Sequence, residues 1–273
     1  MKIGVCIRAR DEQKIIYDWT KYYINLGFDK IIIYDNMSNP SIEETLNFKG
    51  ILDMNLDSSH IEIIIDTVDH SNQGNIYMDC INKNKDLDWL LLCDADEFIY
   101  IKDGTIKEFL NSFSNDTATI LINWVVFGTS GNLTYDTSKT IFEQFTKRED
   151  YKHFWNIFVK SFIRPKLIET FGNVHITTNI NYKMKDVYNI LKYSDDIGKC
   201  DYIDVKLNCN TPVVIIHYMT LDFESMLNKR MKNSRQHLGF SLEDKKYSLE
   251  WYNGNTYYSF KDNNIDTRML KFI

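Results

Sequence analysis

The chain has 273 residues, 44% of them hydrophobic and 14% aromatic, so it can bury a large core and does not have the composition of a disordered chain. Its formal net charge of −6 argues against binding of nucleic acid through the overall field. No apolar run approaches the roughly 20 residues of a membrane-spanning helix, and Met1 and Lys2 lead straight into a predicted strand, not a signal peptide. Five cysteines without metal-type spacing favour a reducing compartment. We expect a soluble cytoplasmic protein, and docking to a membrane surface stays open.

Strands and helices alternate in the first third of the chain. Apolar runs and alternating patterns predict strands at residues 2–8, 30–34, 61–65 and 89–93. Helical spacing of apolar residues predicts helices at 14–26 and 73–85, and a capping box from Ser41 to Glu44 begins another. Gly27 suits the position just past the first helix. This alternation predicts an α/β fold with a mostly parallel sheet flanked by helices.

The rest of the chain is less regular. A second capping box runs from Thr105 to Glu108. Further strands are expected at residues 118–127, 158–163 and 212–218, followed by a helix at 221–238. Residues 178–210 are polar and we expect them to pass over a cleft. No linker or repeat interrupts the pattern, so we predict a single domain over residues 1–273 with an irregular C-terminal region.

Each of the first four predicted strands ends in charged or polar residues. These are Arg8 and Arg10, Asp35 and Asn36, Asp66, and Asp94 with Asp96. Because parallel strands end at the same edge of an open α/β sheet, where ligands bind, these side chains predict a binding cleft.

The densest group of acids follows the most apolar strand. Asp94, Asp96 and Glu97 come directly after Trp89–Cys93. In an extended backbone Asp94 and Asp96 would point the same way and could share a hard divalent cation. For an isolated Asp-x-Asp, a solvated acidic turn is the alternative interpretation.

Six motifs in order resemble those of GT-A nucleotide-sugar glycosyltransferases, and more narrowly the family-2-like and family-92-like branch. They are Asp11-Glu12 with Trp19 and Tyr22-Tyr23, Tyr34–Ser38, Gln73 with Tyr77 and Cys80, Asp94–Phe98, Trp124–Gly131, and His217-Tyr218 with Lys229-Arg230. The resemblance covers about residues 3–235. It departs at Arg10-Asp11-Glu12, where relatives often have Asn-Glu. It implies a GT-A (Rossmann-like) fold in which about residues 1–127 bind the nucleotide sugar and about 128–273 face the acceptor.

The resemblance implies a transferase that uses Mn²⁺ or Mg²⁺ and moves a sugar from a nucleotide donor, expected to be UDP-linked, to a glycan or lipid-linked acceptor. The implied metal ligands are Asp94, Asp96 and His217. The residues implied to bind the donor are Arg8, Asp11, Asp35, Asp66, Gln73, Asp94, Lys229 and Arg230. Trp124 and Gly128 would bind the sugar. The candidate catalytic bases are Glu97, His175 and Asp150.

Alternatives remain open at this stage. His217 and Trp124 are also plausible core residues, Asp35 suits an Asx turn, and Lys229-Arg230 suits a solvated helix face. A nucleotidyltransferase would also use acids on an α/β sheet, although the loop Arg8–Glu12 lacks the glycine expected of a phosphate loop. A catalytically inactive glycan-binding or scaffold module is the third hypothesis. The sequence leaves the sugar, the stereochemistry and a homo-oligomeric state open.

Overall fold

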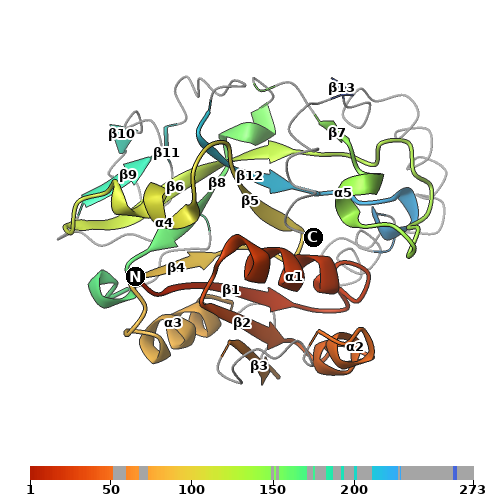
Figure 1. Cartoon of the computed structure of the whole chain (residues 1–273), viewed down its shortest axis with the longest axis horizontal. Coiled ribbons are helices and arrows are strands. Elements are labelled where there is room, and N and C mark those ends of the chain that lie inside the picture. The colour runs from red at the N-terminus through yellow and green to blue at the C-terminus, as the bar shows by residue number, and fades with distance from the viewer. Residues whose placement is uncertain are drawn as a thin grey trace.

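The computed structural model describes residues 1–51, 60–67, 73–148, 151, 154–170, 175, 183–186, 192–193, 200–201, 211–226, 228 and 261–262. The described residues form a mixed sheet with the strand order β3-β2-β1-β4-β8-β6-β12-β5, and β9 pairs with β6 (Figure 1). These strands are β1 Ile3–Ala9, β2 Lys30–Asp35, β3 Ile61–Ile65, β4 Trp89–Leu92, β5 Glu97–Ile101, β6 Thr117–Val126, β8 Val159–Ile163, β9 Lys183–Asp186 and β12 Val213–His217. Two short pairs lie apart from the sheet, β7 Lys147–Arg148 with β13 Lys261–Asp262 and β10 Lys192–Tyr193 with β11 Cys200–Asp201.

The sheet is parallel through β3, β2, β1 and β4, and again where β6 pairs with β12 and β9. β8 and β5 run antiparallel to their neighbours. The predicted fold class, a mostly parallel α/β sheet flanked by helices, is therefore confirmed. The predicted division near residue 127 stays a prediction.

Helices cover both faces of the sheet. They are α1 Ile16–Leu26, α2 Ile42–Phe48, α3 Gln73–Lys83, α4 Ile106–Asn111 and α5 Ile141–Gln144, with 3-10 turns at Phe154–Ile157 and Pro165–Leu167. Because strand side chains alternate between faces, Val5 of β1 packs in the large core with Trp19 of α1, whereas Cys6 packs in a second core with Tyr77 of α3. Each fully buried large side chain of this kind contributes roughly 1.5–3 kcal/mol.

The predicted helix ends are confirmed. Gly27 has a φ of 96° and ends α1, with the next N–H bonded back to Tyr23. Both predicted capping boxes are present, at Ser41 before α2 and at Thr105 before α4. A third box, Thr140 with Glu143, begins α5 and was not predicted although its sequence carries the same signature.

Two expectations need correction. The backbone after β4 is not extended: Ala95 and Asp96 lie in a turn, in which the Glu97 N–H donates to the Asp94 carbonyl at 3.1 Å. The chain then reverses into β5, a strand that was not predicted as a separate element. Of the helix predicted at 221–238, residues 223–226 and 228 are helical, and most of the remainder lies outside the described residues.

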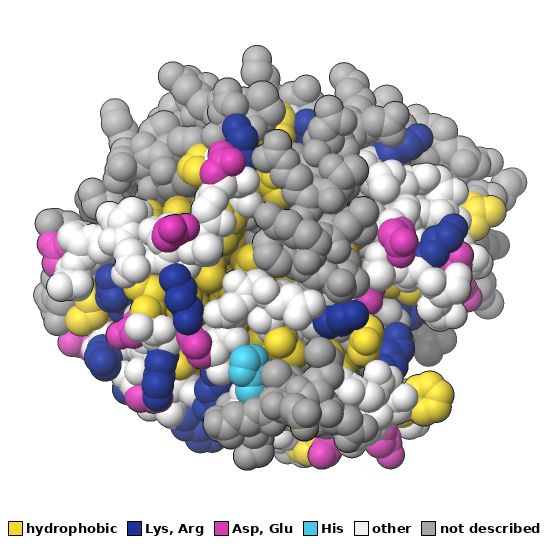
Figure 2. All heavy atoms as spheres, in the orientation of Figure 1, with side chains coloured by type: hydrophobic (Ala, Val, Ile, Leu, Met, Phe, Trp, Pro, Cys, Tyr) yellow, Lys and Arg dark blue, Asp and Glu magenta, His cyan; other side chains and the backbone are white. Residues whose placement is uncertain are grey.

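The described side chains on one face of the molecule carry charges of both signs. Figure 2 shows basic and acidic side chains interspersed on the face that it presents. Within the described ranges, no helix has both the length and the apolar character needed to cross a membrane.

Candidate functional site

The loops at the carboxyl edge of the sheet hold strained backbone. Asp11, Met37, Ser130 and Leu221 have φ values of 58°, 56°, 51° and 52° without being glycines. They follow β1, β2, β6 and β12, four strands that end at the same edge. Left-handed backbone in non-glycine residues is costly and gathers at functional sites, above all for a branched residue such as Leu221. This edge is therefore the candidate site.

The ends of β1, β2 and β3 form a closed polar group. Arg8 Nε donates to Asp66 Oδ2 at 2.6 Å, and both side chains are buried. The Asn36 amide donates to the Asp66 carbonyl at 3.0 Å. The two oxygens of Asp35 accept the backbone N–H groups of Ser38 and Ile42, each at 2.9 Å. The Asp35 carboxylate thus bonds N–H groups three and seven residues on, and not the N–H two residues on that defines the Asx turn considered for it. It holds the loop after β2 and the start of α2.

A buried lysine that sequence analysis did not identify contacts the acids of the turn after β4. Lys160, the second residue of β8, is fully buried and donates to Asp94 Oδ2 at 2.6 Å. Its Nζ also lies 3.3 Å from Glu97 Oε2, and Glu97 is fully buried too. The same Glu97 oxygen accepts the Asp94 N–H at 2.8 Å. Asp94, with a side chain 39% exposed, is the member of this group that reaches solvent.

Burial and these ion pairs together shift the pKa values of all three groups. Burial raises the pKa of Glu97 to about 7, against the opposing effect of Lys160. Burial alone would raise the pKa of Asp94 and lower that of Lys160. The attraction between the two charges outweighs burial in both cases, so the pKa of Asp94 falls and that of Lys160 rises. The lysine is therefore a permanent cation beneath the Asp-x-Asp turn.

His217 faces two carboxylates. It lies directly opposite Glu97 in the β12–β5 ladder. Its Nδ1 is 3.9 Å from Glu97 Oε1 and its Nε2 is 3.6 Å from Asp96 Oδ1. The Trp124 ring packs against the imidazole with a centroid distance of 4.3 Å. Neither Glu97 Oε1 nor His217 Nδ1 has a hydrogen-bond partner in the described part of the chain.

This arrangement fits a cation at Asp96 and His217. A neutral imidazole carries one N–H, so it can satisfy one of the two carboxylates, and its lone pair then faces the other. A proton or a metal ion between Nε2 and Asp96 would remove that repulsion. The described residues contain no group of three or more histidine, cysteine or acidic side chains suited to a metal. A magnesium-type ion often takes one or two protein ligands and completes its shell from substrate phosphates and water, so two side chains are sufficient.

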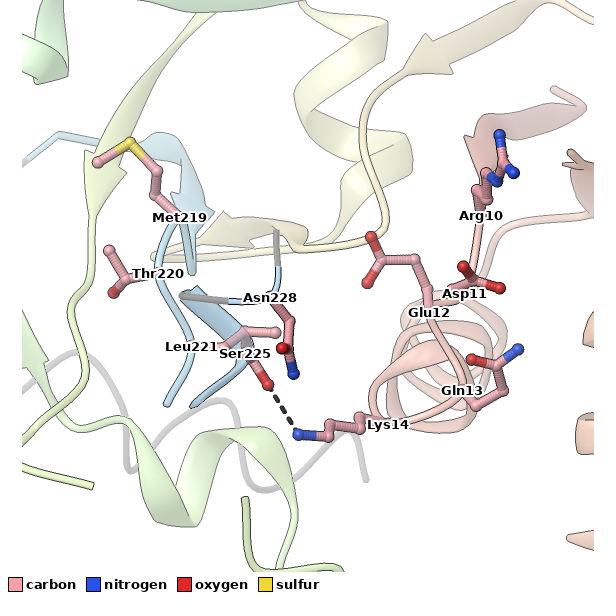
Figure 3. Close-up of a pocket in the computed structure, with 10 residues that line it drawn as sticks. All are labelled: Arg10, Asp11, Glu12, Gln13, Lys14, Met219, Thr220, Leu221, Ser225 and Asn228. Carbon is pink, nitrogen blue, oxygen red and sulfur yellow. Dashed lines mark hydrogen bonds between the residues drawn. The ribbon is translucent and has the colours of Figure 1, made fainter. Parts of the chain in front are cut away.

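A pocket of about 220 Å³ lies next to this pair. The segment 10–14, between β1 and α1, forms one side, and residues of the segment 219–228 form the other (Figure 3). Lys14 joins the two sides because its Nζ donates to Ser225 Oγ at 2.8 Å. The Tyr218 N–H, just before the second segment, donates to the Asp96 carbonyl at 2.9 Å. Tyr218 thus joins the 219–228 side of the pocket to the Asp96–His217 pair through the backbone, although neither member of the pair lines the pocket.

The other predicted residues fall into four groups. Asp11 lines the pocket. Trp124 and His175 lie beside the acids: their rings are 5.4 Å apart, and burial lowers the pKa of His175. Gln73 begins α3, and the Gly128 N–H donates to the Lys147 carbonyl at 3.2 Å. Asp150, Lys229 and Arg230 lie outside the described residues. The roles assigned to all these residues stay predictions.

The sequence of the predicted strand 158–163 contains a pattern that could have identified Lys160. It is the one charged residue in the predicted strand 158–163, where its neighbours Val159, Ser161 and Phe162 are apolar or small. A lysine at an inward position of a buried strand needs a partner of opposite charge. Pairing strand 158–163 with strand 89–93 would have identified that partner, but the antiparallel pairing of distant strands does not follow from local sequence.

Comparisons of sequence and structure match the chain to known proteins. The model of the family described as glycosyltransferase family 92 matches residues 1–256. A family 92 protein of Oryza sativa subsp. japonica is 25% identical over 113 residues, which cover 40% of this chain and 18% of that protein. A family 92 protein of Ricinus communis is 22% identical over 205 residues, which cover 70% of this chain and 32% of that protein. The chain thus spans less than a third of the length of these curated relatives. The structure of S. aureus TarS covers 93% of this chain and 78% of its own, with 12% identity and a TM-score of 0.42.

Proposed function

This chain belongs to glycosyltransferase family 92, as its motifs predicted, and we propose that it transfers a sugar from a nucleotide-sugar donor in a reaction that depends on a divalent cation. UDP is the expected nucleotide and Mn²⁺ or Mg²⁺ the expected ion. The expected acceptor is a glycan or a lipid-linked glycan.

The position of His217 between two carboxylates carries the proposal. Asp96 Oδ1 and His217 Nε2 are 3.6 Å apart, both side chains are buried, and their lone pairs converge once Nδ1 carries the proton. A carboxylate and an imidazole brought together at the carboxyl edge of the sheet are side chains that divalent cations take as ligands. A site that binds a cation together with its substrate explains this arrangement.

We assign cation binding, donor binding and exclusion of water to different residues of the chain. Asp96 and His217 would hold the ion, which when bound would offset the charge that develops on the departing nucleoside diphosphate. The pocket between segments 10–14 and 219–228 would hold the donor, with Arg10 and Lys14 as its cationic side chains. Glu97 and Lys160 lie beneath the turn and exclude water from its inner side.

The test is calorimetric titration with UDP, GDP and CMP, each with Mn²⁺ and again with EDTA. We expect one nucleotide, UDP, to bind in the presence of Mn²⁺ and to lose binding with EDTA. Asp96→Asn should abolish this binding. Asp86→Asn is the matched control because Asp86 is exposed and precedes β4, at the opposite edge of the sheet.

The alternative functions predict different reaction products from the same protein. A nucleotidyltransferase would release pyrophosphate from a nucleoside triphosphate and a sugar phosphate, whereas a glycosyltransferase would release UDP from a UDP-sugar. A folded wild-type protein that binds none of the nucleotides with Mn²⁺ would overturn the proposal in favour of a scaffold.

A further inference from the structure

Three aromatic side chains, here called the aromatic row, lie one after another and end at His217. The rings of Trp155 and Phe158 stack with a centroid distance of 5.3 Å and an interplanar angle of 29°. The Phe158 ring lies 5.2 Å from that of Trp124, which in turn lies 4.3 Å from the His217 imidazole. Trp155 and Phe158 are partly exposed, whereas Trp124 is 6% exposed. The row therefore leads from the surface towards the Asp96–His217 pair.

The backbone that carries the two outer rings is attached to β6 by a buried amide. Asn156 lies in the 3-10 turn before β8 and is 1% exposed. Its Oδ1 accepts the Val126 N–H at 2.9 Å, and its backbone carbonyl accepts the Asn123 amide at 3.2 Å. The Trp124 N–H donates to the Phe158 carbonyl at 2.8 Å. Because these hydrogen bonds fix the turn, the outer rings are held in place before a ligand binds.

The inner end of the row offers a hydrogen-bond donor. The Nε1 atom of Trp124 is buried and has no hydrogen-bond partner in the described part of the chain. A buried indole N–H usually has an acceptor, so this donor indicates a ligand that supplies one. The partly exposed rings of Trp155 and Phe158 continue the row outwards. A ligand with an apolar face and an oxygen acceptor fits both features.

We propose that the aromatic row is the subsite for the acceptor and that it binds the acceptor as a saccharide ring. A pyranose presents C–H groups with partial positive charge, which pack on the negative face of an aromatic ring. One of its hydroxyl oxygens would accept the Trp124 N–H. The assignment to the acceptor rests on the proposed function. Saccharide binding by the row can be measured without metal or nucleotide.

The row is separate from the pocket proposed for the donor. Among the described residues that line that pocket, none belongs to the row. The segment 10–14 of the pocket follows β1, whereas Trp124 belongs to β6 and Phe158 directly precedes β8. In the sheet β4 lies between β1 and β8, and Asp96 is in the turn after β4. A donor in the pocket and an acceptor on the row would thus approach the Asp96–His217 pair from different sides.

Indole ¹H–¹⁵N spectra of the wild-type protein test the proposal. The probes are the methyl α- and β-glycosides of glucose, galactose, mannose and N-acetylglucosamine, each titrated alone. The variants Trp89→Phe, Trp124→Phe and Trp155→Phe assign the three signals needed. Trp89 is the internal control because it is fully buried at the start of β4, at the opposite edge of the sheet. We expect at least one glycoside to shift the signals of Trp124 and Trp155 and to leave that of Trp89 unchanged.

Two substitutions at Trp155 separate stacking from apolar bulk. Trp155→Leu keeps an apolar side chain without a ring, so affinity for the bound glycoside should fall roughly 3-fold to 10-fold. Trp155→Phe keeps a ring and should retain most of the affinity. Phe48→Ala is the matched control, since Phe48 is an aromatic residue 92% exposed at the end of α2, outside the row. It should bind the glycoside as the wild type does.

A glycoside bound to the row should remain there when UDP and Mg²⁺ are added. Displacement by UDP would assign the row to the donor and overturn the proposal. So would the absence of a shift at Trp124 and Trp155 with every glycoside, or equal affinity in Trp155→Leu and the wild type. Should Trp155→Leu fail to fold, the wild-type titrations decide. Glycoside binding by a protein that binds no nucleotide with Mn²⁺ would support the saccharide site and overturn the proposed function, so the two failures are distinguishable.

Discussion

Two groups of polar side chains lie at the same edge of the sheet, and they differ in how completely their charges are matched. At the ends of β1, β2 and β3, Arg8 pairs with Asp66 and both oxygens of Asp35 accept backbone N–H groups. At the ends of β4 and β12, two carboxylates face one imidazole, and Glu97 Oε1 and His217 Nδ1 lack hydrogen-bond partners in the described part of the chain. The carboxylates of Asp35 and Asp66 in the first group are paired within the chain, whereas the proposed cation would complete the second group.

This difference suggests a different role for each group: the first supports the fold, and the second is the candidate site. Buried polar groups in native proteins are almost always hydrogen-bonded, so each exception needs a reason. In the first group the carboxylates connect loops and begin a helix, which stabilises the fold. If the second group binds the proposed cation, it gives up stability where that cation would enter, a common trade between stability and activity. Substitutions in the two groups should therefore have different effects on stability and binding.

The largest effect on stability is expected from Lys160→Met. The change removes the cation and leaves Asp94 and Glu97 facing each other over a buried methionine. Breaking a buried ion pair from one side costs about 3–5 kcal/mol in the free energy of unfolding. Urea denaturation followed by circular dichroism measures this. Lys107→Met is the control, because its pair with Asp29 is exposed and contributes under about 1 kcal/mol. Equal stability of the two variants would contradict a structural role for Lys160.

A smaller effect should distinguish Asp35→Ala from Asp96→Ala. The first variant loses the acceptor for the N–H groups of Ser38 and Ile42, so its free energy of unfolding should fall by about 1–2 kcal/mol. The second removes one of two carboxylates that face an imidazole, so its stability should stay within about 1 kcal/mol of the wild type. Urea denaturation gives both values. An equal loss in the two variants would remove the distinction between the groups.

The first group was more predictable from sequence than the second. Apolar alternation and capping boxes identify β1, β2 and β3 and the helices between them, because those patterns reflect local geometry. The polar residues at the strand ends follow from the parallel order. The contact between Arg8 and Asp66 was not predicted, but the pairing of neighbouring parallel strands places their ends together.

The second group depends on pairings that no local pattern encodes. Asp94 and His217 were identified through motifs, but Lys160 approaches them because β8 runs antiparallel between β4 and β6. The turn at Asp96 reverses the chain into β5, which puts Glu97 opposite His217 and behind the site. An extended backbone, as expected from sequence, would have directed Asp94 and Asp96 to one ion. The turn instead places Asp94 Oδ2 within hydrogen-bond distance of Lys160, and the roles predicted for Asp94 in metal and donor binding stay predictions.

The smallest effect is expected at Asp18, a buried carboxylate of the supporting kind. Its Oδ2 accepts the Ile141 N–H at 2.7 Å and so connects α1 to α5. Burial raises the pKa of Asp18 above its ordinary value, although the hydrogen bond from Ile141 opposes this. The folded protein therefore holds the proton more tightly than the unfolded chain. Stability from this group is complete below the unfolded pKa and falls as the pH rises through the folded pKa.

Asp18→Asn keeps an oxygen that can accept the Ile141 N–H and removes the charge. Its free energy of unfolding at pH 7 should equal that of the wild type or exceed it by under about 1 kcal/mol. The decline in stability above about pH 4 should be less steep than in the wild type. Urea denaturation at several pH values tests both, with the exposed Asp86→Asn as control. A clear loss of stability at pH 7 would mean that the negative charge itself holds α5. The contribution of the supporting carboxylates to stability would then depend on their charge and not on hydrogen bonding alone. Complete hydrogen bonding would no longer distinguish the first group of polar side chains from the second.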